Sequence, residues 1–436
     1  MTASASSSPE LREIPRARRV AGTVTPPSSK SVSHRCFDLA LLAGAPITIE
    51  RPLVAEDTRL FLAALETCGF AVRPDGDVVH LEPRGETGGG EIFCGNAGTM
   101  FRFLVAALTA IPGRWRLDGT ERLRERPVGP LLATLRQLGA SIACPRQEGY
   151  APLDIAGGSL RGGTATLDAG ESSQYLSAVL LAALKAPAPT TVEVLALTSA
   201  PYLELSLEAA RRFGGVIERT ADGFFHVEPG LAPPSRVRVE ADYSAACYPA
   251  AAAALAGGEV VLEGLAPDSR QGDRGFFDLL RRMGVPLAWD DRDGAAVAVV
   301  GRGRLEAVEA DLSSMPDQVP TLAALAPFAH GVTRIRGVPH LRIKESDRLA
   351  AMATELGKLG VPVEELADGL IIPGVWAGGV PSGLPPVTVD TWDDHRIAMS
   401  LALVGLRRGG VTLRDPHVVA KSYPDFWRDL GELVEA

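Results

Sequence analysis

The residues best suited to chemistry are lysines and arginines that stand beside small hydroxyl residues or glycines at the expected starts of helices. The first such segment, Ser28–Arg35, comes directly before a helix expected over 36–43. Hydroxyl residues cap helices, and the backbone N–H groups and dipole of a helix start favour anions. Lys30 and Arg35 would add positive charge there. A plain capped helix with two solvent-facing cations fits the same residues equally well.

A glycine-containing turn precedes the next helix that carries an arginine. Gly95–Thr99 leads into a helix expected over 100–108, in which Arg102 lies. Its two glycines would let the backbone approach a ligand closely. The turn lacks both the glycine pattern of a dinucleotide fingerprint and the Gly-Lys pair of a Walker loop. On its own, the segment is typical of a helix start.

Hydroxyl and amide side chains open two helices further along the chain. Ser172, Ser173 and Gln174 precede a helix expected over 176–184, and Ser199 precedes a helix that begins with proline. Side chains of these types can bind a phosphate or a hydroxyl group. They also serve as ordinary helix caps, so both interpretations stay open at this point.

Charged residues take the place of hydroxyls before other helices. Arg126 ends the charge run 121–126, and Pro127 fixes its backbone just before a helix, although such runs are usually solvated surface. Asp317 precedes an apolar helix and could simply be its cap. Each of these signals alone is therefore compatible with a structural role.

The segment Arg342–Arg348 packs several charges into an expected helix start. Lys344 and Arg348 are four residues apart, which predicts that they face the same side of that helix. An exposed, salt-bridged turn is the alternative. Arg396 opens a helix rich in Ala and Leu, and Lys421 precedes the last helix of the chain.

All these segments place hydroxyl, glycine or charged residues at helix starts in both halves of the chain. The protein is acidic, with 44 Lys and Arg against 53 Asp and Glu and a net charge of −9, which argues against general nucleic-acid binding. Any anion must therefore be held by a local basic cluster. If the helix starts of two domains face each other, they focus positive potential on one site. We therefore predict a cleft for small anionic substrates between two domains.

A helix, a glycine that ends it and a short apolar strand recur along the chain. Apolar residues at helical spacing predict each helix, and the glycine explains its end. These glycines are about 70 to 76 residues apart, a period longer than that of ordinary solenoid repeats. Six copies suggest two domains of three units each. The copies are Phe61–Val72, Leu131–Ile142, Leu205–Ile217, Phe276–Leu287, Met352–Val363 and, at the C-terminus, Phe426–Ala436.

Segments rich in proline mark two candidate domain boundaries. Gly230–Pro234 predicts a boundary near residue 240, and Thr25–Ser28 contains two prolines that block a helix. If the chain crosses between domains at both points, its first strand belongs to the C-terminal domain. We expect an N-terminal domain over 28–240, a C-terminal domain made of 12–27 and 241–436, and a disordered tail over 1–11.

The composition is that of a soluble globular protein, with 46% hydrophobic and 22% charged residues. No apolar run is long enough to span a bilayer, and residues 1–9 lack the apolar stretch of a secretory signal. The five cysteines have no paired spacing, which predicts reduced thiols, and no His/Cys cluster has metal-ligand spacing. We therefore expect a cytoplasmic protein with no metal site and no membrane partner.

Eight motifs in a fixed order are far more specific together than any of them is alone. From about residue 20 to the C-terminus, the chain resembles the EPSP synthase (3-phosphoshikimate 1-carboxyvinyltransferase) family of enolpyruvyl transferases. The motifs are Lys30-Ser31-x-Ser33-x-Arg35, Gly95-Asn96-Ala97-Gly98-Thr99 with Arg102, Glu125-Arg126-Pro127, Ser172-Ser173-Gln174, Pro316-Asp317, Lys344-Glu345-x-Asp347-Arg348, Asp394-His395-Arg396 and Lys421-Ser422-x-Pro424-Asp425.

The resemblance implies a fold and a reaction. The fold would be two similar α/β domains, each of three βαβαββ units with buried helices and outer sheets, an inside-out α/β barrel, hinged around a cleft. The family transfers the enolpyruvyl group of phosphoenolpyruvate to the 5-hydroxyl of shikimate 3-phosphate and releases phosphate, in the shikimate pathway to chorismate and aromatic amino acids. The resemblance implies that no metal or organic cofactor is needed, and that the protein is a monomer.

The resemblance also implies the site residues. Asp317 would be the general base that accepts the 5-hydroxyl proton, while Glu345, or Lys30, would protonate the methylene carbon of phosphoenolpyruvate. Two phosphates and two carboxylates need several cations, and arginine binds such groups bidentately. Shikimate 3-phosphate would contact Lys30, Ser31, Arg35, Ser172, Ser173, Gln174, Ser199, Asp317 and Lys344. Phosphoenolpyruvate would contact Lys30, Gly98, Arg126, Gln174, Arg348, Arg396 and Lys421.

Some positions depart from the usual family pattern without removing a charge that the mechanism needs. His34 stands where Asn is common, Phe103 where Pro is common, and Pro26-Pro27-Ser28 where Leu-Pro-Gly is usual. His340 replaces an Asn that contacts shikimate 3-phosphate in some members, so we do not assign that contact. Gly98 leaves the phosphoenolpyruvate pocket unobstructed, which predicts inhibition by glyphosate, the known inhibitor of the family.

Two other functions are compatible with parts of the sequence. UDP-N-acetylglucosamine enolpyruvyl transferases resemble this fold, but their first motif has Lys-Asn and they commonly use a loop cysteine. This chain has Lys30-Ser31, and its loop Arg122–Arg126 has no cysteine. A non-catalytic anion-binding module is disfavoured by Asp317 and Glu345, because carboxylates would repel an anion unless they handle protons.

Overall fold

The computed structural model describes residues 10–85, 88–221, 223–292, 295–300 and 304–435. The chain divides into two compact domains. The N-terminal domain comprises Pro27–Asp242 and Asp268–Gly272, and the C-terminal domain comprises the chain up to Pro26, Tyr243–Pro267 and the chain from Asp273 onward. Leu11 lies in the first strand and pairs with Arg414, so the tail expected over 1–11 extends too far.

The N-terminal domain contains three four-stranded sheets, with orders β15-β4-β6-β5, β7-β8-β10-β9 and β11-β12-β14-β13. Each sheet joins one parallel pair (β4 with β15, β7 with β8, β11 with β12) to two antiparallel pairs. The strands are β4 Ile47–Glu50, β5 Phe70–Asp75, β6 Val78–Pro83, β7 Gly89–Phe93, β8 Gly113–Asp118, β9 Ser141–Ala143, β10 Leu153–Gly157, β11 Gly163–Ala169, β12 Thr190–Leu197, β13 Val216–Arg219, β14 Phe224–Glu228 and β15 Arg236–Arg238.

The C-terminal domain repeats this plan with the sheets β17-β18-β16-β3, β19-β20-β22-β21 and β1-β24-β23, and adds the pair β2-β25. Each of the three sheets again contains one parallel pair. The strands are β1 Leu11–Ile14, β2 Arg19–Val20, β3 Gly22–Val24, β16 Val260–Leu262, β17 Leu287–Arg292, β18 Ala295–Val300, β19 Glu309–Asp311, β20 Val332–Arg336, β21 Glu364–Leu366, β22 Gly369–Pro373, β23 Val387–Asp390, β24 Val411–Arg414 and β25 Val434–Glu435.

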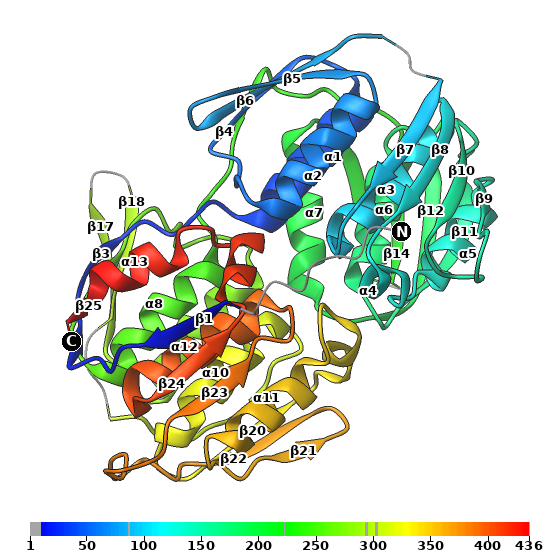
Figure 1. Cartoon of the computed structure of the whole chain (residues 1–436). Coiled ribbons are helices and arrows are strands. Elements are labelled where there is room, and N and C mark those ends of the chain that lie inside the picture. The colour runs from blue at the N-terminus through cyan, green and yellow to red at the C-terminus, as the bar shows by residue number, and fades with distance from the viewer. Residues whose placement is uncertain (1–9, 86–87, 222, 293–294, 301–303, 436) are drawn as a thin grey trace, which may run out of the picture. The chain divides into compact units, whose positions relative to one another are not determined.

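The helices of both domains pack against the inner faces of these sheets (Figure 1). The helices are α1 Lys30–Ala43, α2 Glu56–Thr67, α3 Gly98–Ala110, α4 Glu121–Arg124, α5 Gly129–Gln137, α6 Ser173–Ala183, α7 Ala200–Arg212, α8 Tyr243–Ala256, α9 Gly275–Arg282, α10 Val319–Leu325, α11 Arg348–Lys358, α12 His395–Arg408 and α13 Phe426–Leu433. The 3-10 turns are η1 Gly272–Arg274, η2 Pro316–Gln318, η3 Ala326–Phe328, η4 Pro339–Ile343 and η5 Pro416–Lys421.

One helix in each repeat is buried almost all round. In α6, ten of its residues are buried, and α1, α3, α8, α10 and α12 are similarly enclosed. A helix that is apolar on all sides is stable only in such an interior position. The strands instead alternate: β11 buries Ala165, Leu167 and Ala169 and exposes the residues between them. Buried helices and outer sheets confirm the inside-out α/β fold that the sequence implied.

The recurring sequence pattern corresponds to an amphipathic helix followed by the edge strand of a sheet. The first five copies give α2 with β5, α5 with β9, α7 with β13, α9 with β17 and α11 with β21. Their glycines all have a positive φ, such as 90° at Gly69 and 91° at Gly360, which explains the choice of glycine. The sixth copy differs, because Gly431 lies inside α13 and does not end it.

The helices that carry the candidate residues begin earlier than the sequence predicted. Helix α1 begins at Lys30 rather than at residue 36, because Ser29 caps it. Helix α6 begins at Ser173 rather than at residue 176, because Ser172 caps it, and α3 begins at Gly98. Hydroxyl residues that the sequence placed ahead of a helix therefore lie at its cap or in its first turn, where backbone N–H groups are exposed to a ligand.

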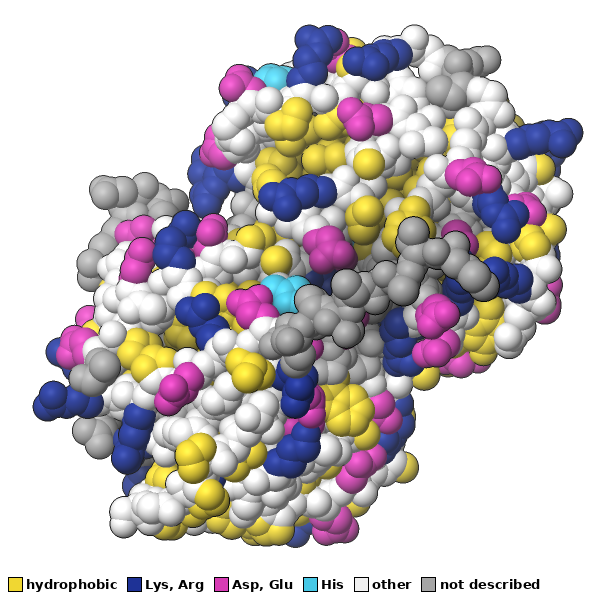
Figure 2. Space-filling model, viewed as in Figure 1, with side chains coloured by type: hydrophobic (Ala, Val, Ile, Leu, Met, Phe, Trp, Pro, Cys, Tyr) yellow, Lys and Arg dark blue, Asp and Glu magenta, His cyan; other side chains and the backbone are white. Residues whose placement is uncertain are grey.

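Among the described residues, none of the helices combines the length and apolar character needed to cross a membrane. All five cysteines lie in the described parts of the chain as free thiols. On the face drawn in Figure 2, basic and acidic side chains are interspersed. Any strongly basic region must therefore be a local feature rather than a property of this whole face.

Candidate active site

In the N-terminal domain, hydrogen bonds tie the first two turns of several helices together. Arg35 of α1 donates from Nε to Oγ of Ser206 in α7 at 2.8 Å, and from Nη2 to the carbonyl oxygen of Tyr202 at 2.6 Å. Ser206 in turn donates to Oγ of Ser177 in α6 at 2.7 Å. The N-terminal parts of α1, α6 and α7 consequently lie close together, as a site for anions requires.

The start of α1 carries two cations with different environments. Nζ of Lys30 lies 3.2 Å from Oδ2 of Asp57, and its backbone N–H donates to Asp242 at 3.0 Å. Arg35 also donates to the carbonyl oxygen of Ser31 at 2.8 Å and is 1% exposed. Burial lowers the pKa of Arg35 to about 10, so it stays charged at neutral pH. Three of its five N–H groups are bonded within the domain.

A glutamine joins α6 to α3. Gln174 donates from Nε2 to Oγ1 of Thr99 at 2.9 Å and accepts from Nη1 of Arg102 at 2.8 Å. The guanidinium of Arg102 lies 5.5 Å from the ring centre of Tyr175, and its buried Nε has no hydrogen-bond partner among the described residues. The amide of Gln174 is thus fixed in orientation. Arg102, which has no assigned role in the sequence motifs, provides part of that orientation.

Arg126 lies directly over the first residue of α3. A Cβ atom added to Gly98 would lie 2.5 Å from Nη2 of Arg126, closer than any van der Waals contact. Nη1 of Arg126 donates to the carbonyl and side-chain oxygens of Asn96 at 3.2 and 3.3 Å. Helix α3 has no side-chain cap at Ala97. A bound anion would therefore meet both the guanidinium and the helix start.

The predicted serines also occupy helix starts. Ser172 accepts from the N–H of Gln174 at 3.3 Å as the cap of α6, and its own O–H can still donate to a ligand. Ser173 follows in the first turn of α6 and is 3% exposed. Ser199 precedes α7 with a left-handed backbone, φ 51°, and makes no side-chain cap bond.

In the C-terminal domain, Asp317 lies between two arginines. Nη1 of Arg348 donates to Oδ1 of Asp317 and Nη2 of Arg396 donates to Oδ2, both at 2.7 Å. The side chains of Arg348 and Arg396 are 2% and 7% exposed, whereas Asp317 is 22% exposed. Buried charge-assisted hydrogen bonds of this length are strong, so the carboxylate is held in a fixed orientation.

Asp394 orients both of these arginines. Its Oδ2 accepts from Nε of Arg348 at 2.8 Å and from Oγ of Ser346 at 3.0 Å. Its Oδ1 accepts from the backbone N–H of Arg396 at 2.9 Å, which caps α12. Nη2 of Arg348 also donates to Oε2 of Glu345 at 3.0 Å. Three carboxylates, each from a different one of the motifs quoted above, thus meet around one guanidinium.

Two carboxyl groups near this cluster have pKa values shifted in opposite directions. Burial alone would raise the pKa of Asp317, but attraction to Arg396, Arg348 and Lys344 outweighs it and holds the pKa well below its usual value. Burial, together with repulsion from Asp317, raises the pKa of Asp273 to about 6. At neutral pH, Asp317 is therefore ionised, whereas the pKa of Asp273, at about 6, lies well above its usual value of 3.8.

Lys344 does not lie in a helix, so the prediction that it shares a helical face with Arg348 is wrong. Helix α11 begins only at Arg348, because Asp347 caps it, and Lys344 is the extended residue after η4. Burial, followed by repulsion from Lys344, lowers the pKa of the neighbouring His340 to about 4. Lys421 ends η5 and is 7% exposed.

Comparison with known proteins gives this geometry a context. The profile of the family described as EPSP synthase (3-phosphoshikimate 1-carboxyvinyltransferase) matches residues 14–430. A 3-phosphoshikimate 1-carboxyvinyltransferase of Syntrophobacter fumaroxidans is 46% identical over 412 residues, 93% of this chain and 96% of that protein. One of Vibrio cholerae is 40% identical over 423 residues, 95% of this chain and 97% of that protein. The chain belongs to the EPSP synthase family.

Solved structures agree with this assignment of the chain to the EPSP synthase family. An EPSP synthase of Acinetobacter baumannii superimposes with a TM-score of 0.80 at 27% identity and covers 98% of each chain. The enolpyruvyl transferase NikO of Streptomyces tendae has a TM-score of 0.76 at 22% identity, covers 98% of this chain and 97% of that chain, and shares the fold. The recognition made from the motifs is confirmed, and the protein is a transferase.

Two residues that depart from the EPSP synthase pattern, His34 and Phe103, are packed in the protein interior. His34 is buried, its ring meets Phe61 edge-on with centroids 5.4 Å apart, and burial lowers its pKa to about 3, so it is neutral. Phe103 is buried in α3, and the guanidinium of Arg35 lies 5.3 Å from its ring centre. Neither residue adds a charge to the site.

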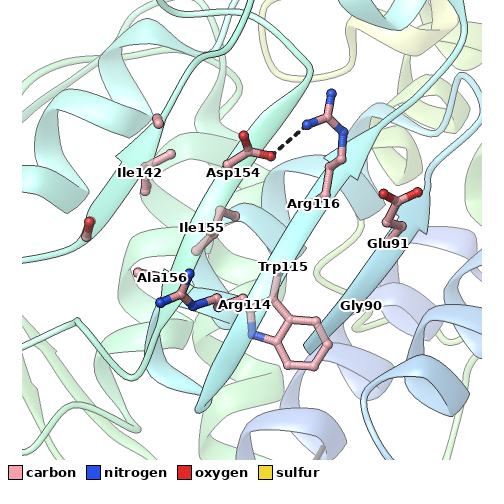
Figure 3. A pocket seen from close by; sticks show the side chains of 11 residues that line it. Gly90, Glu91, Arg114, Trp115, Arg116, Ile142, Asp154, Ile155 and Ala156 are labelled. Carbon is pink, nitrogen blue, oxygen red and sulfur yellow. Dashed lines mark hydrogen bonds and ion pairs between the residues drawn. The ribbon is translucent and has the colours of Figure 1, made fainter. Parts of the chain in front are cut away.

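A hollow of about 630 Å³ lies on the outer face of the sheet β7-β8-β10-β9 (Figure 3). Figure 3 shows the ion pair between Arg116 and Asp154, 3.0 Å long, across its wall. None of the predicted EPSP synthase site residues lines it. In the described parts of the chain, no three His, Cys, Asp or Glu side chains are grouped as metal ligands.

Proposed function

We infer that this chain catalyses the reaction of its family. It transfers the carboxyvinyl group of phosphoenolpyruvate to the 5-hydroxyl of shikimate 3-phosphate, giving 5-enolpyruvylshikimate 3-phosphate and phosphate, a step in aromatic amino-acid biosynthesis. The observation that carries this inference is the ionised Asp317 held between Arg348 and Arg396. It combines a proton acceptor with two cations that suit the carboxylate or phosphate of phosphoenolpyruvate.

The binding roles are proposals that rest on residue type and position. Shikimate 3-phosphate binds to Lys30, Ser31, Arg35, Ser172, Ser173, Gln174, Ser199, Asp317 and Lys344. Phosphoenolpyruvate binds to Lys30, Gly98, Arg126, Gln174, Arg348, Arg396 and Lys421. In support, the hydroxyls and Arg35 lie at the linked starts of α1, α6 and α7, and Arg126 lies over the start of α3. Within the phosphoenolpyruvate set, Arg348, Arg396 and Lys421 belong to the C-terminal domain and the other residues to the N-terminal domain.

Asp317 becomes a useful base when a substrate takes over hydrogen-bond donors of its two arginines. While Arg348 and Arg396 bond to it, the low pKa of Asp317 makes it a poor proton acceptor. An anionic substrate that takes over N–H donors of both guanidinium groups weakens their hold on Asp317. Its pKa then rises toward the value that general-base catalysis favours. Substrate binding itself would therefore activate the base.

The proton transfers balance over the two steps of the reaction. Asp317 takes the proton of the 5-hydroxyl as the hydroxyl oxygen bonds to C2 of phosphoenolpyruvate. Glu345 or Lys30 delivers a proton to C3. The resulting tetrahedral intermediate returns a proton from the new methyl group to Glu345 or Lys30, and phosphate leaves with the proton that Asp317 had taken. This restores the double bond and both catalytic groups. Glu345 lies 3.0 Å from Arg348, so it is near the proposed reacting atoms.

A phosphate-release assay tests the function. We expect phosphate release only when shikimate 3-phosphate and phosphoenolpyruvate are both present. Release with UDP-N-acetylglucosamine in place of shikimate 3-phosphate would instead favour the other enolpyruvyl transferase reaction. Tight binding of both substrates without turnover would favour a non-catalytic module. We also propose that the enzyme is cytoplasmic and monomeric and needs no cofactor. The free thiols of all five cysteines support the proposed reducing compartment.

A further inference from the structure

The turn between β23 and α12 has an unusual backbone. Trp392 and Asp393 are consecutive residues with left-handed conformations, φ 57° and 51°, and neither is glycine. Such backbone is disfavoured for residues with a Cβ atom, so surrounding contacts must hold it. The next residue, Asp394, orients Arg348 and caps the helix that carries Arg396. The position of both arginines therefore depends on this turn.

A buried carboxylate on α11 makes two of the contacts that hold the turn. Glu355 is 1% exposed. Its Oε1 accepts from Nε1 of Trp392 at 2.7 Å, and its Oε2 accepts from the backbone N–H of Asp390 at 3.1 Å. Nζ of Lys358 lies 2.8 Å from Glu355 and 2.8 Å from Asp390, which balances the buried charge. Glu355 thus accepts hydrogen bonds from both the first residue of the turn and its left-handed tryptophan.

Helix α11 fixes the turn at two points along one face. Arg348, its first residue, binds Asp394 at the end of the turn, and Glu355, seven residues or about two helical turns later, binds the beginning. A peptide bonded at both ends and at its strained centre has little freedom to reorient. Loss of Glu355 would remove the hydrogen bonds to the backbone N–H of Asp390 and to Nε1 of Trp392 together. The ion pairs of Asp390 with Lys358 and Arg414 and the bonds of Asp394 to Arg348 and Ser346 would remain, but none of these holds the left-handed tryptophan.

We propose that Glu355 is a positioning residue for the phosphoenolpyruvate half of the site, acting through the turn 390–394 on Arg348 and Arg396. The proposal rests on the function inferred above. Glu355 touches neither substrate. Its removal should weaken binding of phosphoenolpyruvate selectively, because the proposed shikimate 3-phosphate residues lie mainly at the helix starts of the other domain.

Three variants grade the loss of these contacts. Glu355→Ala removes both acceptors. Glu355→Gln keeps one acceptor oxygen, so it can satisfy either Trp392 or Asp390 but not both. Trp392→Phe removes only the Nε1–H donor. Glu309→Gln is the matched control, because it removes the same charge in the same domain from an exposed pair with Arg336.

We expect the KM for phosphoenolpyruvate, measured by phosphate release at saturating shikimate 3-phosphate, to rise about ten-fold or more in Glu355→Ala. Glu355→Gln and Trp392→Phe should show smaller rises, and Glu309→Gln none. The dissociation constant of shikimate 3-phosphate, measured by calorimetry, should stay within two-fold throughout. If Glu355→Ala does not fold, the two milder variants carry the same comparison.

Unchanged KM values for phosphoenolpyruvate in the folded Glu355 variants would overturn the proposal, as would equal weakening of both substrates. A wild-type protein without phosphate release would contradict the proposed function instead. In that case, the rise in Tm that phosphoenolpyruvate gives the protein still decides the inference. It should be smaller in the Glu355 variants than in the wild type, and an equal rise would overturn the proposal.

Discussion

Arg348 and Asp317 form a 2.7 Å ion pair in which the arginine is also bonded to Glu345 and Asp394. The cation is therefore shared by three carboxylates in a nearly buried position. Its excess positive charge is balanced within the domain before any substrate binds. An incoming anion must compete with these carboxylates, and Asp317, the most exposed of the three, is the partner most readily displaced.

Asp317→Ala should reduce kcat by at least about a hundred-fold, because positioned acid–base catalysis typically contributes 10²–10⁴-fold. The KM for phosphoenolpyruvate should not rise, because the substitution removes a competitor for Arg348 and Arg396. Phosphate release and calorimetry measure the two effects. Asp278→Asn, at an exposed carboxylate paired with Arg281, is the control. Normal kcat in Asp317→Ala would exclude this residue as the base.

Gly98→Ala should raise the KM for phosphoenolpyruvate about ten-fold, equivalent to about 1.4 kcal/mol of binding free energy. The new methyl group must push away the guanidinium of Arg126, because it would lie 2.5 to 2.8 Å from its atoms. Tm should be maintained, since a helix favours alanine over glycine. Gly357→Ala, in α11 with open space around its Cβ, should leave the KM unchanged and raise the Tm, because alanine stabilises the interior of a helix relative to glycine. An unchanged KM for Gly98→Ala would contradict the proposed role of Arg126.

Glyphosate should inhibit the wild-type enzyme in competition with phosphoenolpyruvate. The inhibitor carries a phosphonate and a carboxylate, which suit the cations proposed for phosphoenolpyruvate. Gly98 adds no side chain that would obstruct binding to these cations, and Phe103 is a buried residue of α3. The measurement is phosphate release across a glyphosate series at several phosphoenolpyruvate concentrations. A curve that stays flat to high glyphosate concentration would refute this prediction.

Asp273→Asn should stabilise the protein at pH 7 relative to the wild type, but not at pH 4. The pKa of Asp273 is raised from 3.8 to about 6, so the folded state holds this proton more tightly than the unfolded chain does. The contribution of Asp273 to the free energy of unfolding therefore falls as the pH rises from about 4 to about 6. Asparagine cannot ionise, and its side-chain oxygen can still accept from Gln318 and Ser244.

Thermal unfolding at both pH values measures this difference. The difference in Tm between Asp273→Asn and the wild type should grow with pH, whereas Asp278→Asn should show no such trend because its carboxylate is exposed. A difference that is the same at both pH values would show that ionisation of Asp273 does not oppose folding.

The sequence by itself determined the repeat, the family and the residue types of the site. Helical periodicity and a glycine that permits a left-handed backbone are local properties, so five of the six helix–glycine–strand copies could be read directly. The order of the motifs determined the family. Local signals failed at helix starts, because a cap such as Ser29 or Ser172 extends a helix by residues that periodicity does not reveal.

Only the tertiary structure decided how those residues act on one another. No spacing in the sequence indicates that Asp394 orients Arg348, that Arg102 fixes Gln174, or that Lys344 lies outside the helix. These pairs are distant in the chain or separated by a cap. Their distances, and the opposite pKa shifts of Asp317 and Asp273, follow from burial and from charges on other elements. Such long-range terms arise only when the chain is folded.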